Sequence, residues 1–343
     1  MSKFPKIDMP PKSRFIVFFF LVLIITNCES DKKYYRPDLP EKLCTIGIIN
    51  ADDTIRFISF EKSFQIEYSD ELNDSLRDFS FYISDPSKEL YKNEFESIKN
   101  LIGFKLPDTL SFREGSKYFL HGKERDVPEI LAECTVPELP DKPILDSYET
   151  ETIILSEPMP CTNLTDNRSI QLSFSFKSQK NSYYAILVKG FGYSLRSELF
   201  GTVSSILDFS VRDCNSPGFS AVLYGYYKDN WICDNNLLIR AKSPVFAYFL
   251  DGSMIPDQTC LLKISSSYHN GFCIIDLLKS ITVTILSIPK DLFYFEKSLY
   301  TYKQSSQDPF SEPIYLNGNI KNGNGVFSIC RSSELQINFN PGI

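Results

Sequence analysis

Histidine, closely spaced cysteines and long apolar runs are scarce in this chain of 343 residues. The two histidines, His121 and His269, stand far apart, and none of the nine cysteines forms a CxxC pair. Because a zinc site needs several His or Cys ligands at short spacing, the sequence predicts no metal site. It also lacks a GxSxG elbow, an HExxH helix, a P-loop and an EF-hand loop. The sequence therefore predicts no cofactor and no catalytic residue.

Positive charge is outnumbered, with 36 Lys and Arg against 43 Asp and Glu. Without residues 1–27 the balance is 32 against 42, so the formal net charge is −10. No basic run stands out, which disfavours binding to nucleic acid or to anionic lipid through charge. The 28 Phe and 19 Tyr predict a folded chain with a large core.

The longest apolar run, Phe15–Ile25, has 11 residues. At about 1.5 Å per residue it is too short to cross a hydrocarbon core about 30 Å thick. Its end, Ile25-Thr26-Asn27-Cys28, resembles a lipobox, and four positive residues precede it: Lys3, Lys6, Lys12 and Arg14. We therefore predict a lipoprotein signal peptide at 1–27 and lipidation of Cys28. The alternative is an ordinary secretory signal followed by a coincidental cysteine.

Residues 28–42 are expected to be the lipidated cysteine and a charged tether, in which Pro37 and Pro40 limit regular structure. Glu29 and Asp31 loosely resemble the acidic surface-export signals of Bacteroidetes lipoproteins. We expect a protein anchored by lipid in the outer membrane. The sequence leaves open whether it faces the periplasm or the cell surface.

Short runs of alternating apolar and polar residues, separated by turn signals, predict an all-β fold with two antiparallel β-sandwich-like domains. Residues 43–135 are expected to form an Ig-like β-sandwich. Residues 136–160 contain five prolines and are expected to be a linker with little regular structure. Residues 161–343 are expected to form a larger β-rich domain.

One segment near the C-terminus predicts a helix near 289–304. Pro289 suits a first helical turn, and Asp291 and Lys303 suit the two ends of the helix dipole. Apolar side chains recur along one face, at Leu292, Phe295, Leu299 and Tyr302. This face is expected to pack on a sheet, and a partner-binding helix is the alternative.

Eight cysteines follow Cys28, and an even number in an exported protein favours disulfides. The candidates are Cys44, Cys134, Cys161, Cys214, Cys233, Cys260, Cys273 and Cys330. A bond between Cys44 and Cys134 would staple the first domain, and Cys214 with Cys233 is the pair expected in the second. The alternative is that these are buried thiols, acting as small apolar side chains.

The C-terminal segment resembles an uncharacterised Bacteroidetes lipoprotein family, domain of unknown function 4249. That family carries a Y-x-x-L helix, then NPFSEP, then N-I-x-x-G-x-G-x-F. The matching residues here are the helix Leu292–Leu299, then Asp308, Pro309, Phe310, Ser311, Glu312 and Pro313, then Asn319, Gly323, Gly325 and Phe327. Asp308 stands where the family has Asn. The resemblance implies an outer-membrane lipoprotein that accompanies a TonB-dependent receptor, and it offers no catalytic residues.

The same motif has a structural interpretation. Pro309 and Pro313 fix the backbone around Phe310, which is expected to fill an apolar gap. Gly323 and Gly325 are expected to permit positive φ in the following turn. A rigid corner is favoured, and a loop that grips a ligand is the alternative.

Three tripeptides in the first predicted domain have the form Asp-Ser/Thr-apolar, which resembles the O-glycosylation acceptor of Bacteroidetes. Their acceptor residues are Thr54, Ser75 and Thr109. Such tripeptides also arise by chance, so each is a candidate and no more.

These features predict a non-enzymatic outer-membrane lipoprotein that binds or assists a TonB-dependent uptake system, with an unknown ligand. One alternative is a structural or adhesive surface lipoprotein resembling fimbrial anchors. Another is a hydrolase of glycans or peptides, although no spacing selects a carboxylate pair for that chemistry.

Overall fold

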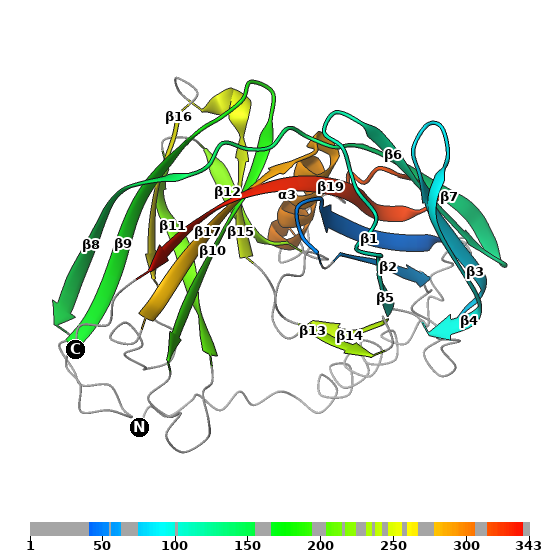
Figure 1. Ribbon diagram of the computed structural model, residues 1–343, viewed down its shortest axis with the longest axis horizontal. Helices are drawn as coiled ribbons and strands as arrows, with labels where there is room; N and C mark the ends of the chain where they lie inside the picture. Colours follow the sequence, from blue (N-terminus) through cyan, green and yellow to red (C-terminus); the bar gives the residue numbers. More distant parts are fainter. Residues whose placement is uncertain are drawn as a thin grey trace, which may run out of the picture. The chain divides into compact units, whose positions relative to one another are not determined.

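Two β-sheets make up most of the structure, a computed structural model (Figure 1). It describes residues 41–54, 56–62, 75–99, 102–154, 166–193, 204–214, 217–223, 231–234, 237–241, 246–255, 259–266, 278–305 and 314–338. The expected all-β class with one helix near the C-terminus is confirmed. In the described part of the chain, no helix is long and apolar enough to span a membrane.

The larger sheet has 14 strands. Its main order is β13 (Trp231–Asp234), β14 (Leu237–Ala241), β5 (Ile102–Lys105), β2 (Phe57–Lys62), β1 (Leu43–Asn50), β19 (Asn324–Asn338), β17 (Leu278–Ile288), β10 (Tyr183–Tyr193), β11 (Ser204–Cys214), β16 (Thr259–Ser266), β9 (Asp166–Lys177) and β8 (Ile144–Ile154). Two more strands branch from β10: β15 (Phe246–Asp251), followed by β12 (Gly218–Val222).

The smaller sheet has five strands. Their order is β18 (Ile320–Lys321), β7 (Val127–Thr135), β6 (Lys117–Glu124), β3 (Ser75–Ser84) and β4 (Glu89–Lys99). A short 3-10 turn, η1 (Gly252–Met254), follows β15, and the helix is α3 (Lys290–Ser305).

β19 connects the early and late parts of the chain. Its first half pairs in parallel with β1, Asn324–Cys330 against Cys44–Asn50. Its second half pairs antiparallel with β17, Arg331–Asn338 against Ser287–Ser280. One 15-residue strand therefore places β1 and β17 in the same sheet.

Both faces of the central strands are buried. On β17 the odd residues from Ile281 to Ile285 lie in one core, while Leu286 and Ile288 lie in another. Burial on both faces explains why Ser280–Ile288 contains no charged residue, because a charge would be unfavourable on either face. The face of the larger sheet that carries Ile281 to Ile285, here called its first face, also packs on the smaller sheet. A cluster of phenylalanines lies there, including Phe60, Phe79 and Phe81.

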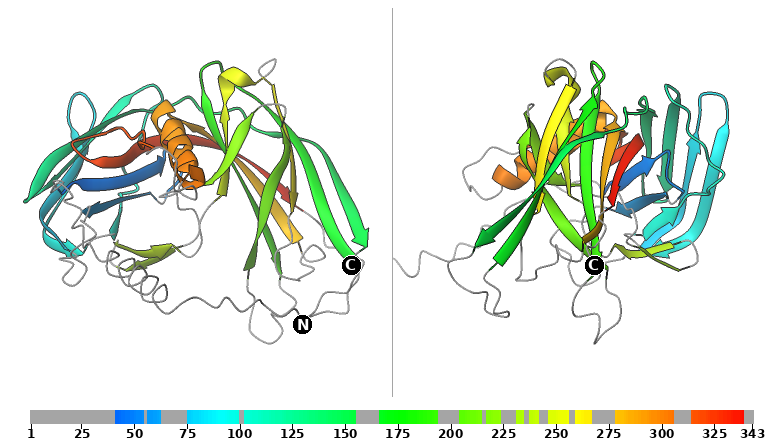
Figure 2. Two further views of the ribbon diagram at one scale, coloured as in Figure 1. Left: turned by 180° about the vertical axis from the view of Figure 1, so that it is seen from behind. Right: turned by 60° about the vertical axis from the view of Figure 1, so that its left-hand side comes forward.

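α3 covers the second face of the large sheet, where Figure 2 shows it lying against the strands. Leu292, Phe293 and Phe295 are buried there, so the predicted helix and its packing on a sheet are confirmed. Tyr302 differs from the expectation, since it is 48% exposed. It lies in the last turn of α3.

The described residues do not divide at 136–160, where the sequence suggested a linker between two domains. Residues Glu41–Ile343 form one unit, and β8 occupies Ile144–Ile154 inside the expected linker. The reason is the β1–β19 pairing, which joins both expected domains through one sheet. Prolines at Pro137, Pro140 and Pro143 precede β8 instead of preventing it.

The predicted bond between Cys44 and Cys134 is wrong, because both residues are thiols. Cys44 shares a face of β1 with Ile46 and Ile48, which pack toward α3. Cys134 lies in the core on the other face, between the two sheets. β1 therefore separates the two sulfur atoms. Cys330 is also a buried thiol, and it packs on the α3 side.

Several predicted residues, or their side chains, lie outside the described part of the chain. Cys28, Cys161, Cys273 and the motif Asp308–Pro313 lie outside the described residues. Cys214 and Cys233 belong to β11 and β13, but their side chains are not among those described, so their pairing stays a prediction.

Candidate functional site

The described part of the family motif joins the two sheets. The Asn319 side chain accepts a hydrogen bond from the Phe327 N–H at 2.9 Å and donates to the Phe327 carbonyl at 2.8 Å. It also donates to the Glu133 carbonyl of β7 at 3.0 Å. Asn319 thus replaces a neighbouring strand along this part of β19 and ties it to the smaller sheet. This supports the structural interpretation of the motif for the residues described.

The two motif glycines have different roles. Gly325 adopts a φ of 107°, as expected, and a Cβ there would overlap the Thr45 carbonyl. The expectation of positive φ at Gly323 is wrong. Asn322 takes the left-handed conformation, with a φ of 60°, while Gly323 gives room for the Leu43 carbonyl. Both glycines let the β19 turn lie directly against the β1 backbone.

A cysteine sulfur atom adds to the joint, as we call the contacts through which Asn319 connects β19 to the smaller sheet. The Ile329 N–H donates to the Cys134 Sγ at 3.2 Å, beyond the segment that Asn319 covers. Burial raises the pKa of the Cys134 thiol, so it stays protonated and acts as a weak acceptor. The backbone edge of β19 is therefore satisfied by side chains until β17 takes over at Arg331.

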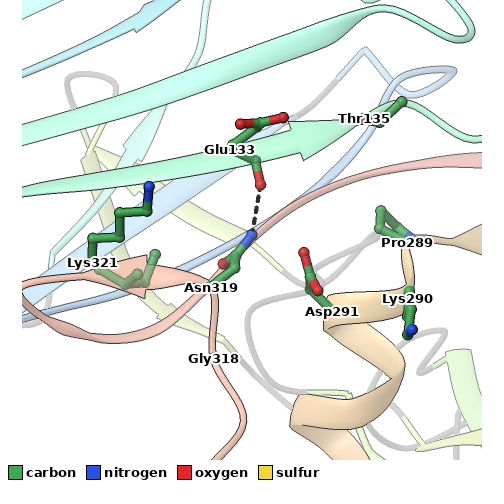
Figure 3. Close-up of a pocket in the computed structure, with 9 residues that line it drawn as sticks. Glu133, Thr135, Pro289, Lys290, Asp291, Gly318, Asn319 and Lys321 are labelled. Atoms are coloured by element: carbon green, nitrogen blue, oxygen red, sulfur yellow. Dashed lines mark hydrogen bonds between the residues drawn. The ribbon is translucent and has the colours of Figure 1, made fainter.

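Next to this joint lies a pocket of about 590 Å³, the candidate functional site (Figure 3). Three segments line it, from β7, from the start of α3 and from the chain around β18. Its residues are Glu133, Thr135, Pro289, Lys290, Asp291, Gly318, Asn319, Ile320 and Lys321. It forms where β17 ends and the chain enters α3, so the β19 edge is no longer covered by a strand.

The pocket contains charges of both signs. Asp291 rises from the first turn of α3 toward the space beside Asn319 (Figure 3). The carboxylate of Glu133 points away from Asn319 and pairs with Lys117 at 2.6 Å. Lys290 lies over the Tyr294 ring, 5.7 Å from its centroid. This arrangement suits recognition of a polar group and contains no nucleophile paired with a base. Among the described residues, no group of three His, Cys, Asp or Glu could hold a metal ion.

Glu296 is a functional candidate that the sequence interpretation missed. It is 0% exposed, and neither carboxylate oxygen has a hydrogen-bond partner among the described residues. Burial raises the pKa of Glu296 to about 8, opposed by the charge of Lys303. Its position between Leu292 and Leu299 on the apolar face was the available signal, because a glutamate there cannot reach bulk water.

A second buried carboxylate, Glu124, has partners. It is ion-paired with Lys62 at 3.1 Å and accepts backbone N–H bonds from Arg77 and Asp126. Burial alone would raise its pKa, but these donors together hold the pKa below its ordinary value. This ion pair connects the last residue of β2 to the last residue of β6.

Two predicted glycosylation acceptors, Thr54 and Thr109, are exposed in turns. Arg56 connects these turns by donating to the carbonyls of Asp53 and Leu110. The third candidate, Ser75, begins β3, and its side chain lies outside those described. Exposure is necessary for modification, and the modification itself stays a prediction.

Residues 32–336 match a protein family described as Domain of unknown function (DUF4249). No curated protein matches the chain. Among the 13 matching chains of solved structures is one described as "Complete structure of manganese lipoxygenase of Gaeumannomyces graminis and partial structure of zonadhesin of Komagataella pastoris". It is 8% identical, with a TM-score of 0.17, and the match covers 72% of this chain and 88% of that one. A TM-score this low carries no argument about fold or function.

Proposed function

Since this chain belongs to the DUF4249 family, whose function is unknown, we propose its role from its own sequence and surfaces. It is a non-enzymatic lipoprotein, anchored through Cys28 in the outer membrane. It binds and assists a protein of a TonB-dependent uptake system. The lipobox-like segment and the family motif support the anchor and the neighbour, and the surface of the larger sheet supports binding.

The observation that carries this proposal is a pair of exposed apolar side chains on one face of the larger sheet, near its β8 edge. Ile144 of β8 and Leu261 of β16 both pair with Ser175 of β9, so the three side chains lie in one row. Ile144 is 64% exposed and Leu261 is 51% exposed. Single exposed apolar residues are ordinary, but two on the same face, on the strands that flank β9, form a surface suited to a protein partner.

The edge of β8 is less suited to binding than this face. A bulge lies between Leu145 and Ser147, and it turns Asp146 to accept a hydrogen bond from the Ser175 hydroxyl at 2.9 Å. Bulges and acidic side chains hinder the addition of a further strand. This supports docking on the sheet face over strand exchange between subunits, which a fimbrial assembly would use.

The experiment is crosslinking in native membranes, followed by purification in mild detergent. The double change Ile144→Glu and Leu261→Glu should reduce recovery of a large outer-membrane barrel by about tenfold, because charge on this face costs more than about 1.4 kcal/mol of binding. Met254→Glu is the matched control, since Met254 is 56% exposed in η1. Equal recovery with all variants would contradict binding at this face.

Other outcomes separate the alternatives. Recovery of the wild-type protein without a partner protein, together with turnover of a glycan or peptide, would favour a hydrolase. Recovery in fibres would favour an adhesive role. Cys28→Ala tests the anchor independently, because the protein should leave the membrane pellet if lipid holds it there.

A further inference from the structure

The unpartnered carboxyl group of Glu296 is buried in a protein interior that offers it no hydrogen bond among the described residues. An ionised carboxylate in such a place is strongly disfavoured, whereas a protonated one is tolerated. The protonation state of Glu296 is therefore linked to whether α3 stays in place.

α3 packs on β10, β12 and β19. Phe219 of β12 contacts the rings of Phe293 and Tyr300, with 5.7 and 5.3 Å between the ring centroids. These two residues lie one turn before and one turn after Glu296, so Glu296 belongs to the side of the helix that meets β12. Its surroundings are thus aromatic and apolar.

Few ionisable groups accompany Glu296 on the elements around α3. On the same side of the helix, Tyr300 lies one turn later and Lys303 two turns later, and β12 has no ionisable side chain. β10 and β19 contribute the phenol of Tyr183 and the thiol of Cys330, and burial raises the pKa of each to about 12. β15 contributes Asp251, which is the strand partner of Tyr183. Of these groups, Glu296 is the one whose raised pKa brings its charge change near neutral pH.

Glu296 also lies between two connections from α3 to the pocket. Before it, Pro289–Asp291 line one side. After it, the Ser298 hydroxyl accepts the Asn317 N–H at 3.0 Å, and Gly318–Lys321 line the opposite side. A displacement of α3 would therefore change both sides of the pocket.

We propose that the proton on Glu296 is a latch that holds α3 and, through α3, the walls of the pocket. With the proton bound, the neutral carboxyl stays buried and the helix stays in place. When the proton passes to solvent, the carboxylate requires water, and α3 moves outward to admit it. The Ser298–Asn317 hydrogen bond then breaks, and the pocket loosens.

Hydrogen–deuterium exchange of the whole chain tests this at about pH 7 and about pH 9.5, with rates normalised for intrinsic exchange. In the wild type, exchange in 290–305 and at Asn317 should rise by about tenfold or more at the higher pH. Glu296→Gln keeps a neutral side chain of the same size, so the same amides should change less than about twofold. Glu138→Gln, at an exposed position, should behave as the wild type does.

The outcomes are distinct. An equal rise in the wild type and in Glu296→Gln would overturn the latch, as would no rise in the wild type. If Glu296→Gln does not fold, Glu296→Leu and a pH series of the wild type still decide. The exchange rate in 290–305 must rise with pH as the titration of a single group does, and the strands of the two sheets must show no such rise. None of these readouts depends on the partner proposed above.

Discussion

Asn319→Ala is the most informative single change, because one side chain holds three backbone groups from two sheets. It removes the donor and the acceptor that serve Phe327 and the donor that serves the Glu133 carbonyl. Phe327 is 0% exposed, so its N–H and carbonyl cannot turn to bulk water. The substitution therefore leaves two buried groups without partners.

The magnitude follows from these contacts. Leaving a buried donor or acceptor unsatisfied costs about 1–3 kcal/mol, so the two groups of Phe327 predict a loss of about 2–6 kcal/mol. The Glu133 carbonyl lies at an exposed residue and adds little. For a chain of this size we expect the Tm to fall by about 3–9 °C.

Thermal and urea unfolding measure this loss. Asn317→Ala is the matched control, since Asn317 is exposed and uses its backbone N–H to bond Ser298. Asn319→Asp keeps the acceptor for the Phe327 N–H but loses the donors, so it should lie between the two. If Asn319→Ala unfolds at the same temperature and urea concentration as the control, the joint does not hold the sheets together and the motif needs another explanation.

Three further predictions concern the core. Gly325→Ala should cost more than about 1 kcal/mol in urea unfolding, because its Cβ meets the β1 backbone, whereas Gly115→Ala has open space and should cost less; equal losses would contradict the close approach. Glu124→Gln should lose about 1.5–3 kcal/mol at neutral pH, because it removes the charge that Lys62 and two backbone N–H groups meet, while Glu41 still pairs with Lys62 at 3.3 Å. Because the pKa of Glu124 is lowered, this stability is present above about pH 4.5 and is lost on acidification, so the variant should lose less than the wild type as pH falls. Cys134 should resist a thiol reagent in the folded protein and react after unfolding without reductant, and failure to react then would restore the disulfide rejected above.

Local chemistry was predictable from the sequence. The amphipathic spacing from Leu292 onward predicts a helix within one residue of α3, because helix periodicity is a local property. Alternation in segments such as Ile170–Phe176 predicts strands for the same reason. Gly325 was identified because a positive φ in a turn favours glycine whatever surrounds it.

The position of each strand in the sheets was not predictable in this way. Alternation shows which residues share a face, but it does not show which strand lies beside them. Prolines suggested a domain boundary before β8, yet β8 completes the larger sheet beside β9. Cys44 and Cys134 seemed suited to a bond because they lie near the first and last expected strands, and β1 separates them.

The sequence by itself determined the β class, the C-terminal helix and the family motif, since each depends on neighbouring residues, and the lipid anchor stays a prediction from the sequence. The tertiary structure decided the parallel pairing of β1 with β19, the joint at Asn319 and the burial of Glu296. These depend on contacts between segments far apart in the chain, such as Cys44 beside Asn324. Closing so long a loop has an entropic cost that only the packing of whole sheets can offset, and no local pattern records that packing.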